Sequence, residues 1–247
     1  MPVRRRWPEL RIVLPFAAVA AALWAFVWLA GEVVDGDTTR FDRHLLLALR
    51  SPADPSDPLG PLWFEQIARD VTALGSVAVL TLVTVSVLTY LALAGRRAAA
   101  LLVGLCVGGG WVVTEILKTI FARPRPDLVP HGTSVFSASF PSSHAAMSAV
   151  VYLTLGALLA RVEPGRGTKL FLMGGAVALT LLVGVSRVYL AVHWPSDVVA
   201  GWTVGAGWAV LCWSVTRALQ RRGRVEKDTG GRNGASGEGP PPVVGGG

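Results

Sequence analysis

Residues 97–119 read RAAALLVGLCVGGGWVVTEILKT, in which Glu115 is the one charged side chain between Arg97 and Lys118. A helix rises about 1.5 Å per residue, so about 20 mainly apolar residues are enough to cross the hydrocarbon core of a bilayer. This run therefore predicts a membrane-spanning helix.

Five further apolar runs flank it, at residues 12–31, 73–94, 145–160, 169–188 and 197–217. The first follows three arginines, as a signal peptide would. However, it is longer than the roughly 7–15 apolar residues of a signal peptide, and no clear small-residue cleavage site follows, so we expect a retained helix. The sequence thus predicts an all-α fold, a six-transmembrane-helix bundle that forms one membrane domain over residues 12–217.

The composition supports a membrane protein. Hydrophobic residues make up 52% of the chain and charged residues 16%, whereas a soluble domain carries about 25% charged residues. The net charge is +7, but the basic residues cluster at the ends of the apolar runs, which is typical of topology determinants and lipid headgroup contacts. We therefore expect the bilayer as a partner and no nucleic acid. Cys106 and Cys212 lie inside apolar runs and are expected to be buried residues without a disulfide or metal role.

The segment between the first two runs, residues 32–72, is acidic and rich in proline. Within it, a helix from Phe41 to Arg50 would place Phe41, Leu45, Leu46 and Leu49 on one face. This pattern predicts a short interfacial helix in the first outer loop, lying on the membrane surface.

The distribution of lysine and arginine predicts the orientation. One side of the predicted bundle carries 15 of these residues and the other side carries 8. Because the basic side of a membrane protein faces the cytoplasm, we expect a multi-pass protein of the cell membrane with both termini cytoplasmic. The cytoplasmic parts are then residues 1–11 and a tail at 225–247, whose glycine, proline and charge content predicts disorder.

Three polar clusters interrupt the apolar pattern, all on the predicted outer side. Lys118 to Pro126 ends the third helix, Pro141 to His144 begins the fourth, and Ser186 to Asp197 joins the fifth to the sixth. Ionisable residues at membrane depth are expensive, so such clusters point to a functional site.

The residue types in these clusters suit a phosphate. Lys118, Arg125 and Arg187 supply three cations, and arginine matches phosphate oxygens with two parallel hydrogen bonds. Ser142 is placed as the N-cap of the fourth helix, so that the free backbone amides of the first turn can bind an anion. Taken singly, these residues could be interface anchors or a plain cap; together, on one face, they predict a phosphate site.

Two histidines could supply a nucleophile and a proton donor to this site. Asp197 lies four residues after His193 and could accept a hydrogen bond from one ring nitrogen, which would leave the other nitrogen free to attack. His144, in the first turn of the fourth helix, could protonate a leaving oxygen. The alternative for His193 and Asp197 is a satisfied polar pair at a helix start.

The three clusters resemble the signature of the PAP2 (type 2 phosphatidic acid phosphatase) superfamily, in which Lys-x6-Arg-Pro, Pro-Ser-Gly-His and Ser-Arg-x5-His-x3-Asp follow in this order. Lys118 to Arg125-Pro126 fits the first spacing, and Ser186-Arg187 to Asp197 fits the third. Arg123 offers a competing register, but Arg125 alone satisfies the six-residue gap. The resemblance covers about residues 70–217.

The resemblance implies a membrane lipid phosphatase with a phosphohistidine intermediate. It makes His193 the nucleophile, Asp197 its orienting partner and His144 the proton donor and then base. The implied phosphate ligands are Lys118, Arg125, Ser142, Ser143 and Arg187. The family uses no metal or other cofactor here, and the sequence offers no carboxylate cluster for a metal.

One position departs from the family pattern, because Ser143 stands where glycine is usual. Serine keeps the backbone amide, and it is tolerated if the backbone φ is helical but strained if φ is positive. We expect Ser143 at the first helical position, where φ is helical.

The motifs recognise phosphate and do not select the lipid. The family's bacterial members act on phosphatidic acid, phosphatidylglycerol phosphate, undecaprenyl diphosphate and related lipids, so we expect an outer-leaflet lipid phosphate as substrate, with phosphatidic acid or another general lipid phosphate first. The alternatives are a lipid phosphotransferase of the same superfamily, a vanadium-dependent haloperoxidase, and a non-catalytic polytopic lipid-binding protein. The sequence does not predict the oligomeric state.

Overall fold

The structure is a computed structural model that describes residues 7–127 and 138–221. These residues contain eight α-helices and no strand. The predicted disordered tail at 225–247 lies outside them. The helices are α1 (Trp7–Asp35), α2 (Thr39–Leu47), α3 (Leu62–Ala73), α4 (Val77–Leu93), α5 (Arg97–Phe121), α6 (Ser143–Val162), α7 (Arg166–Tyr189) and α8 (Pro195–Arg221).

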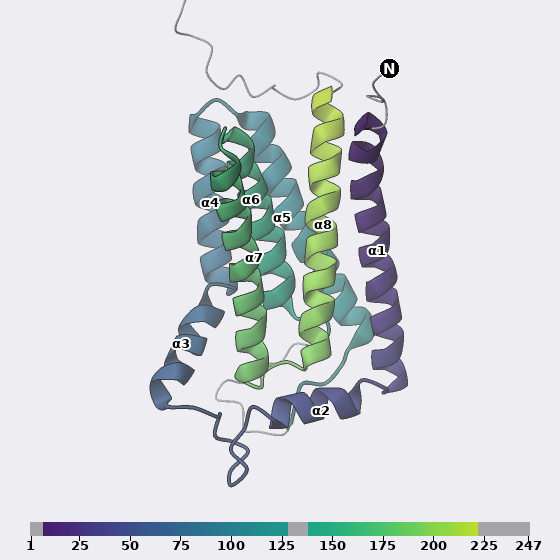
Figure 1. The fold of residues 1–247 in the computed structure, drawn as a ribbon, viewed down its shortest axis with the longest axis vertical. Helices are drawn as coiled ribbons and strands as arrows, with labels where there is room; N and C mark the ends of the chain where they lie inside the picture. The colour runs from purple at the N-terminus through teal and green to yellow at the C-terminus, as the bar shows by residue number, and fades with distance from the viewer. Residues whose placement is uncertain (1–6, 128–137, 222–247) are drawn as a thin grey trace, which may run out of the picture.

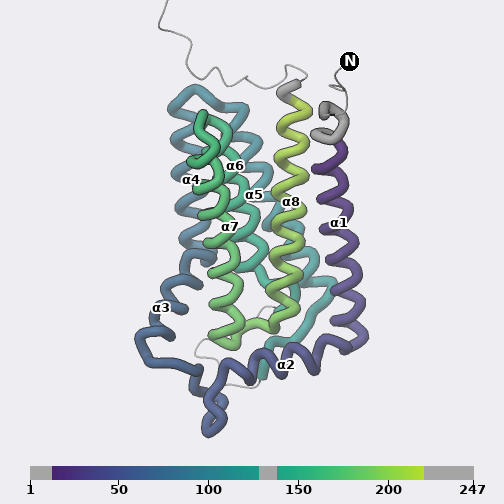
Figure 2. Tube along the Cα trace, viewed as in Figure 1, coloured from purple at the N-terminus to yellow at the C-terminus, as the bar shows by residue number. Residues whose placement is uncertain are grey.

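Figure 1 shows α1, α4, α5, α6, α7 and α8 running along the long axis of the molecule, while α2 lies across one end of the bundle. We call this end, where α5 ends at Phe121 and α8 begins at Pro195, the site end. The described chain begins and ends together at the opposite end (Figure 2). This arrangement fits the predicted placement of both termini on one side of a membrane.

Among the described residues, five helices are long and apolar enough to span a membrane, namely α1, α5, α6, α7 and α8. A sixth span is obtained only if α3 and α4, which meet at 45°, count as one broken span. The sequence predicted an unbroken helix at residues 73–94, but α4 begins at Val77. The break occurs because Ser76 caps α4, with its Oγ accepting from the Val79 amide at 3.3 Å.

The short helix predicted near Phe41 to Arg50 is present as α2, residues 39–47. Phe41 is exposed, whereas Leu46 and Asp42 are fully buried. Asp42 turns inward because it meets the buried polar cluster described below. The exposed Phe41 suits a membrane surface, and the interfacial location of α2 stays a prediction.

The core of the bundle is built on α6, which packs against α4, α5, α7 and α8. The contact with α8 is close because small side chains face each other there. A Cβ atom built on Gly201 of α8 would lie 2.6 Å from the Ser142 carbonyl oxygen and 2.9 Å from the Ala145 Cβ. Gly201 therefore lets the start of α6 approach α8, and the Ser142 amide donates to the Asp197 carbonyl across this contact at 3.0 Å.

Substituting Gly201→Ala should lower the free energy of unfolding by about 1–3 kcal/mol, because the two backbones must separate to admit one methyl group. Gly175→Ala in α7 is the matched control, since a Cβ there meets nothing within 4 Å. Alanine is the better helix former, so this control should be neutral or slightly stabilising. Denaturant unfolding in detergent measures both changes, and equal destabilisation of the two variants would contradict the close-packing argument.

Candidate active site

The three polar clusters meet at the site end. Lys118 lies in the last turn of α5, Arg187 in the last turn of α7 and Asp197 in the first turn of α8. Ser142 and Ser143 begin α6, while Arg125 and His193 lie in the connecting segments. His144 interacts electrostatically with Arg187, His193, Lys118 and Arg125. The structure thus brings together all eight residues that the sequence predicted for the site.

His193 is held by partners on both ring nitrogens. Its Nδ1 lies 3.5 Å from Oδ2 of Asp197 and 3.3 Å from Oγ of Ser139. Its Nε2 lies 3.2 Å from Nη1 of Arg125. A guanidinium can only donate, so Nε2 must be the acceptor and the ring proton must sit on Nδ1. This tautomer leaves a lone pair on Nε2, on the side of the site cations.

Burial keeps this imidazole neutral. The side chain of His193 is 1% exposed, and burial is the main cause that lowers its pKa from 6.5 to about 4. Arg187 and Arg125 lower the pKa further, while Asp197 opposes the shift. At neutral pH, Nε2 is therefore unprotonated and can act as a nucleophile.

This shift predicts a pH dependence of stability. Between pH 6.5 and pH 4 the unfolded state binds a proton at His193 and the folded state does not, so stability should fall as pH is lowered through that window. The slope approaches about 1.4 kcal/mol per pH unit. His193→Gln cannot titrate and is the control. The unfolding free energy of the wild type minus that of the variant should be constant above pH 6.5 and should decrease below it. A difference that does not depend on pH would contradict a neutral, buried His193 imidazole.

The start of α6 has the expected geometry of an anion site. Ser142 is the N-cap, and its Oγ accepts from the Ala145 amide at 3.5 Å. Ser143 is the first helical residue and is absent from the positive-φ residues of the described chain. Serine therefore causes no backbone strain at the position where the family has glycine, as expected.

Unsatisfied polar atoms at the site suit an anion. The Ser143 Oγ and the Arg187 Nε are buried, and neither has a hydrogen-bond partner among the described residues. Within residues 7–127 and 138–221, neither Lys118 nor Arg187 forms an ion pair with a carboxylate; Arg187 donates to Thr72 Oγ1 at 3.2 Å. Buried polar groups are almost always satisfied in native proteins. An oxyanion among the cations would satisfy these groups and offset their mutual repulsion.

Behind His193 lies a buried network that the sequence did not predict. Arg123 donates to Oδ1 of Asp197 at 2.6 Å, to Oδ2 of Asp42 at 2.8 Å and to Oγ of Ser196 at 2.8 Å. The amide of Ser196 donates to Asp42 at 2.9 Å, and the Ser139 hydroxyl donates to Asp197. The competing Arg123-Pro124 register was the one available signal for Arg123. No sequence pattern near Asp42 or Ser139 indicates a role for them, because these residues approach the site only in the folded chain.

An apolar cavity of about 310 Å³ adjoins the site. It runs between α4 and α5, with Ser143 and His144 at one end and side chains such as Leu80, Val107 and Met147 along it. The cavity therefore has a polar end that suits a phosphate and apolar walls that suit a hydrocarbon chain. This combination fits an amphiphilic substrate.

The comparisons with known proteins agree with this geometry. The model of the PAP2 superfamily matches residues 97–221. Phosphatidylglycerophosphatase B of Bacillus subtilis is 31% identical over 148 residues, which are 58% of this chain and 70% of that protein. Decaprenylphosphoryl-5-phosphoribose phosphatase of Mycobacterium tuberculosis is 32% identical over 139 residues, covering 55% of this chain and 72% of that protein. The crystal structure of a transmembrane PAP2-type phosphatidylglycerolphosphate phosphatase from Bacillus subtilis superposes with a TM-score of 0.71 at 25% identity, covering 82% of this chain and 98% of that one.

The fold and the site thus define a membrane-embedded phosphatase. The chain belongs to the PAP2 superfamily.

Proposed function

We propose that this protein hydrolyses a phosphomonoester or diphosphate of an outer-leaflet lipid through a phosphohistidine intermediate on His193. The observation that carries the proposal is the neutral Nε2 of His193, 3.2 Å from Nη1 of Arg125, with Asp197 behind Nδ1. A nucleophile, its orienting carboxylate and the phosphate-binding cations then act as one unit.

In the first step, the Nε2 lone pair attacks phosphorus while the bond to the leaving oxygen breaks. His144 gives its proton to that oxygen. Lys118, Arg125 and Arg187, together with the α6 amides and the Ser142 and Ser143 hydroxyls, stabilise the negative charge on the non-bridging oxygens.

In the second step, His144 takes a proton from water as the water oxygen attacks phosphorus. The phosphorus–nitrogen bond breaks, its electron pair returns to Nε2, and phosphate leaves. Asp197 stabilises the proton on Nδ1 throughout, so the positive charge that His193 carries in the intermediate has a carboxylate partner.

The substrate class follows from the surroundings of the site. The 310 Å³ cavity beside His144 is lined mainly by apolar side chains of α4 and α5, which favours a lipid chain attached to the phosphate. Relatives are named for phosphatidylglycerophosphate, undecaprenyl diphosphate and decaprenylphosphoryl-5-phosphoribose. Phosphatidic acid or another general lipid phosphate remains our first candidate, with undecaprenyl diphosphate and phosphatidylglycerol phosphate next.

Turnover of a lipid panel tests the proposal. The purified protein in detergent is assayed with phosphatidic acid, phosphatidylglycerol phosphate and undecaprenyl diphosphate, with and without a chelator. We expect phosphate release from at least one lipid, unchanged by chelation. Activity lost on chelation would contradict the metal-free mechanism. Transfer of the phosphoryl group to an added alcohol in place of water would identify a transferase.

The outward orientation of the site is also a proposal, supported by the charge bias and by the common end of the two termini. With Cys106→Ala and Cys212→Ala as the background, Ser56→Cys in the loop before α3 should react with an impermeant thiol reagent in intact cells. Gly165→Cys, at the opposite end of the bundle, should react only after lysis. The reverse pattern would contradict the orientation.

A further inference from the structure

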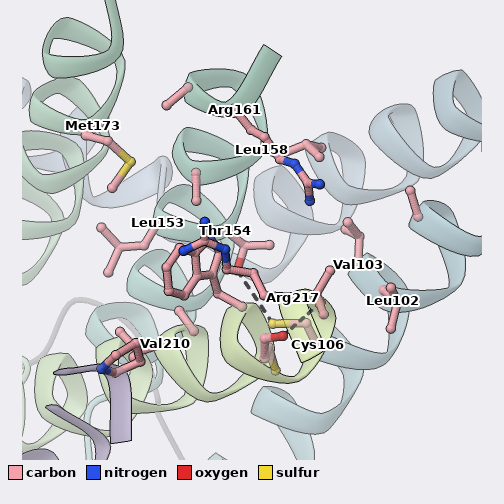
Figure 3. A pocket seen from close by; sticks show the side chains of 18 of the residues that line it. Leu102, Val103, Cys106, Leu153, Thr154, Leu158, Arg161, Met173, Val210 and Arg217 are labelled. Atoms are coloured by element: carbon pink, nitrogen blue, oxygen red, sulfur yellow. Dashed lines mark hydrogen bonds between the residues drawn. The ribbon is translucent and has the colours of Figure 1, made fainter. Parts of the chain in front are cut away.

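A second and larger cavity is lined by residues at the end of the bundle opposite the active site. Figure 3 shows this cavity from close by. Its volume is about 1040 Å³, close to the upper limit of typical ligand pockets. The walls come from α1, the α4–α5 turn, the first part of α5, the second half of α6, the start of α7 and the second half of α8. Nothing in the phosphatase mechanism uses this space.

Four basic side chains line this cavity. They are Arg96, Arg161, Lys169 and Arg217, and none of the described residues that line it is an aspartate or glutamate. Arg96 and Lys169 lie at the starts of α5 and α7, whose N-terminal amides also favour an anion. The guanidinium of Arg217 lies 4.5 Å from the ring centroid of Trp213, which directs it along the cavity wall.

The interior of the cavity is apolar. Val103, Leu153, Met173 and Val210 are among its lining residues (Figure 3). Its deeper polar groups pair with each other, since the Cys106 thiol and the Thr154 hydroxyl lie 3.5 Å apart. A free phosphate would gain nothing from these apolar walls, whereas a lipid would bury its chain against them.

We propose that this cavity binds an anionic phospholipid of the leaflet opposite the active site. The four cations hold the phosphate of the headgroup, and the apolar walls hold the first part of an acyl chain. Basic pockets between transmembrane helices on the cytoplasmic side are known to recognise anionic headgroups. The site is separate from the phosphatase chemistry and does not depend on the proposed substrate.

Binding of phosphatidylglycerol to the intact protein, measured by native mass spectrometry in detergent, tests the proposal, with phosphatidylcholine as the neutral probe. We expect phosphatidylglycerol to be preferred. Lys169→Gln with Arg217→Gln should weaken its binding about thirtyfold. Ala157→Phe, which fills the cavity with a ring, should also weaken binding while leaving every cation in place.

The control is the double variant Arg97→Gln with Arg166→Gln, which removes two cations of the same end that do not line the cavity. It should bind phosphatidylglycerol as the wild type does. Turnover of a soluble phosphate ester, unchanged in all variants, shows that they fold. Equal weakening in the control, equally strong competition by soluble glycerol phosphate, or lipid binding that appears only after removal of residues 222–247 would each overturn the proposal.

Discussion

His193→Ala should lower kcat/KM for every phosphate substrate by at least about 10⁴-fold, while the protein still inserts and folds. The size of the loss follows from the role of a covalent nucleophile, whose removal typically leaves only the catalysis that binding and charge stabilisation supply. The remaining cations and the α6 amides would still bind phosphate, so the residual rate should exceed that in water.

The intermediate provides a second measurement. Brief incubation with a ³²P-labelled substrate followed by an alkaline quench should leave label on the wild-type protein, because a phosphorus–nitrogen bond survives base and is lost in acid. His193→Ala should carry no label. This readout separates loss of the nucleophile from general damage to the site.

His44→Ala is the matched control, since His44 lies on the exposed side of α2, at the same end of the bundle. It should leave activity and labelling unchanged. If His193→Ala kept wild-type turnover, or if label remained on it, another residue would be the nucleophile and the proposed mechanism would be wrong.

The long apolar runs predicted most of the helices because a bilayer imposes a minimum length on each span. Residues 97–119 and 169–188 fall inside α5 and α7. The segment that forms α3 was missed because Glu65, Arg69 and Asp70 interrupt its apolar pattern. Glu65 in the first turn accepts from Arg69 one turn later, at 2.6 Å. Such a pair of charged residues adds nothing to an apolar pattern.

The sequence predicted those candidate site residues whose proximity follows from their spacing along the chain. His193 and Asp197 are four residues apart at a helix start, so their proximity is local. Asp42 is different, because it meets Ser196 across 154 positions. Such a contact exists only after α2 has folded across the end of α8, and no spacing in the chain indicates it.

Arg123 and Arg125 lie two positions apart in the sequence but have different partners in the structure. Arg123 lies between the buried carboxylates of Asp42 and Asp197, with its own side chain 13% exposed. Arg125 donates to the Val192 carbonyl at 2.8 Å and faces Nε2 of His193. We therefore propose that the first arginine positions the carboxylate behind His193 and that the second contacts the phosphate.

Substituting Arg123→Met should lower the free energy of unfolding by about 3–5 kcal/mol, because it leaves two buried carboxylates without a counter-ion. kcat should fall with Asp197 no longer fixed, while inhibition by vanadate, an analogue of the transferred phosphoryl group, should change little. Arg125→Met should have a different profile, with both kcat/KM and vanadate affinity reduced about 10²–10³-fold.

Denaturant unfolding, steady-state kinetics and vanadate inhibition of the two variants in parallel decide between these roles. Adding Asp42→Asn to Arg123→Met should recover part of the stability, because it removes one of the two unpaired charges, whereas adding it to Arg125→Met should destabilise further. If Arg123→Met weakened vanadate binding as strongly as Arg125→Met does, Arg123 would contact the phosphate directly. The distances from Arg123 to Asp42 and Asp197 argue against that result, because both terminal nitrogens of its guanidinium already donate to these carboxylates.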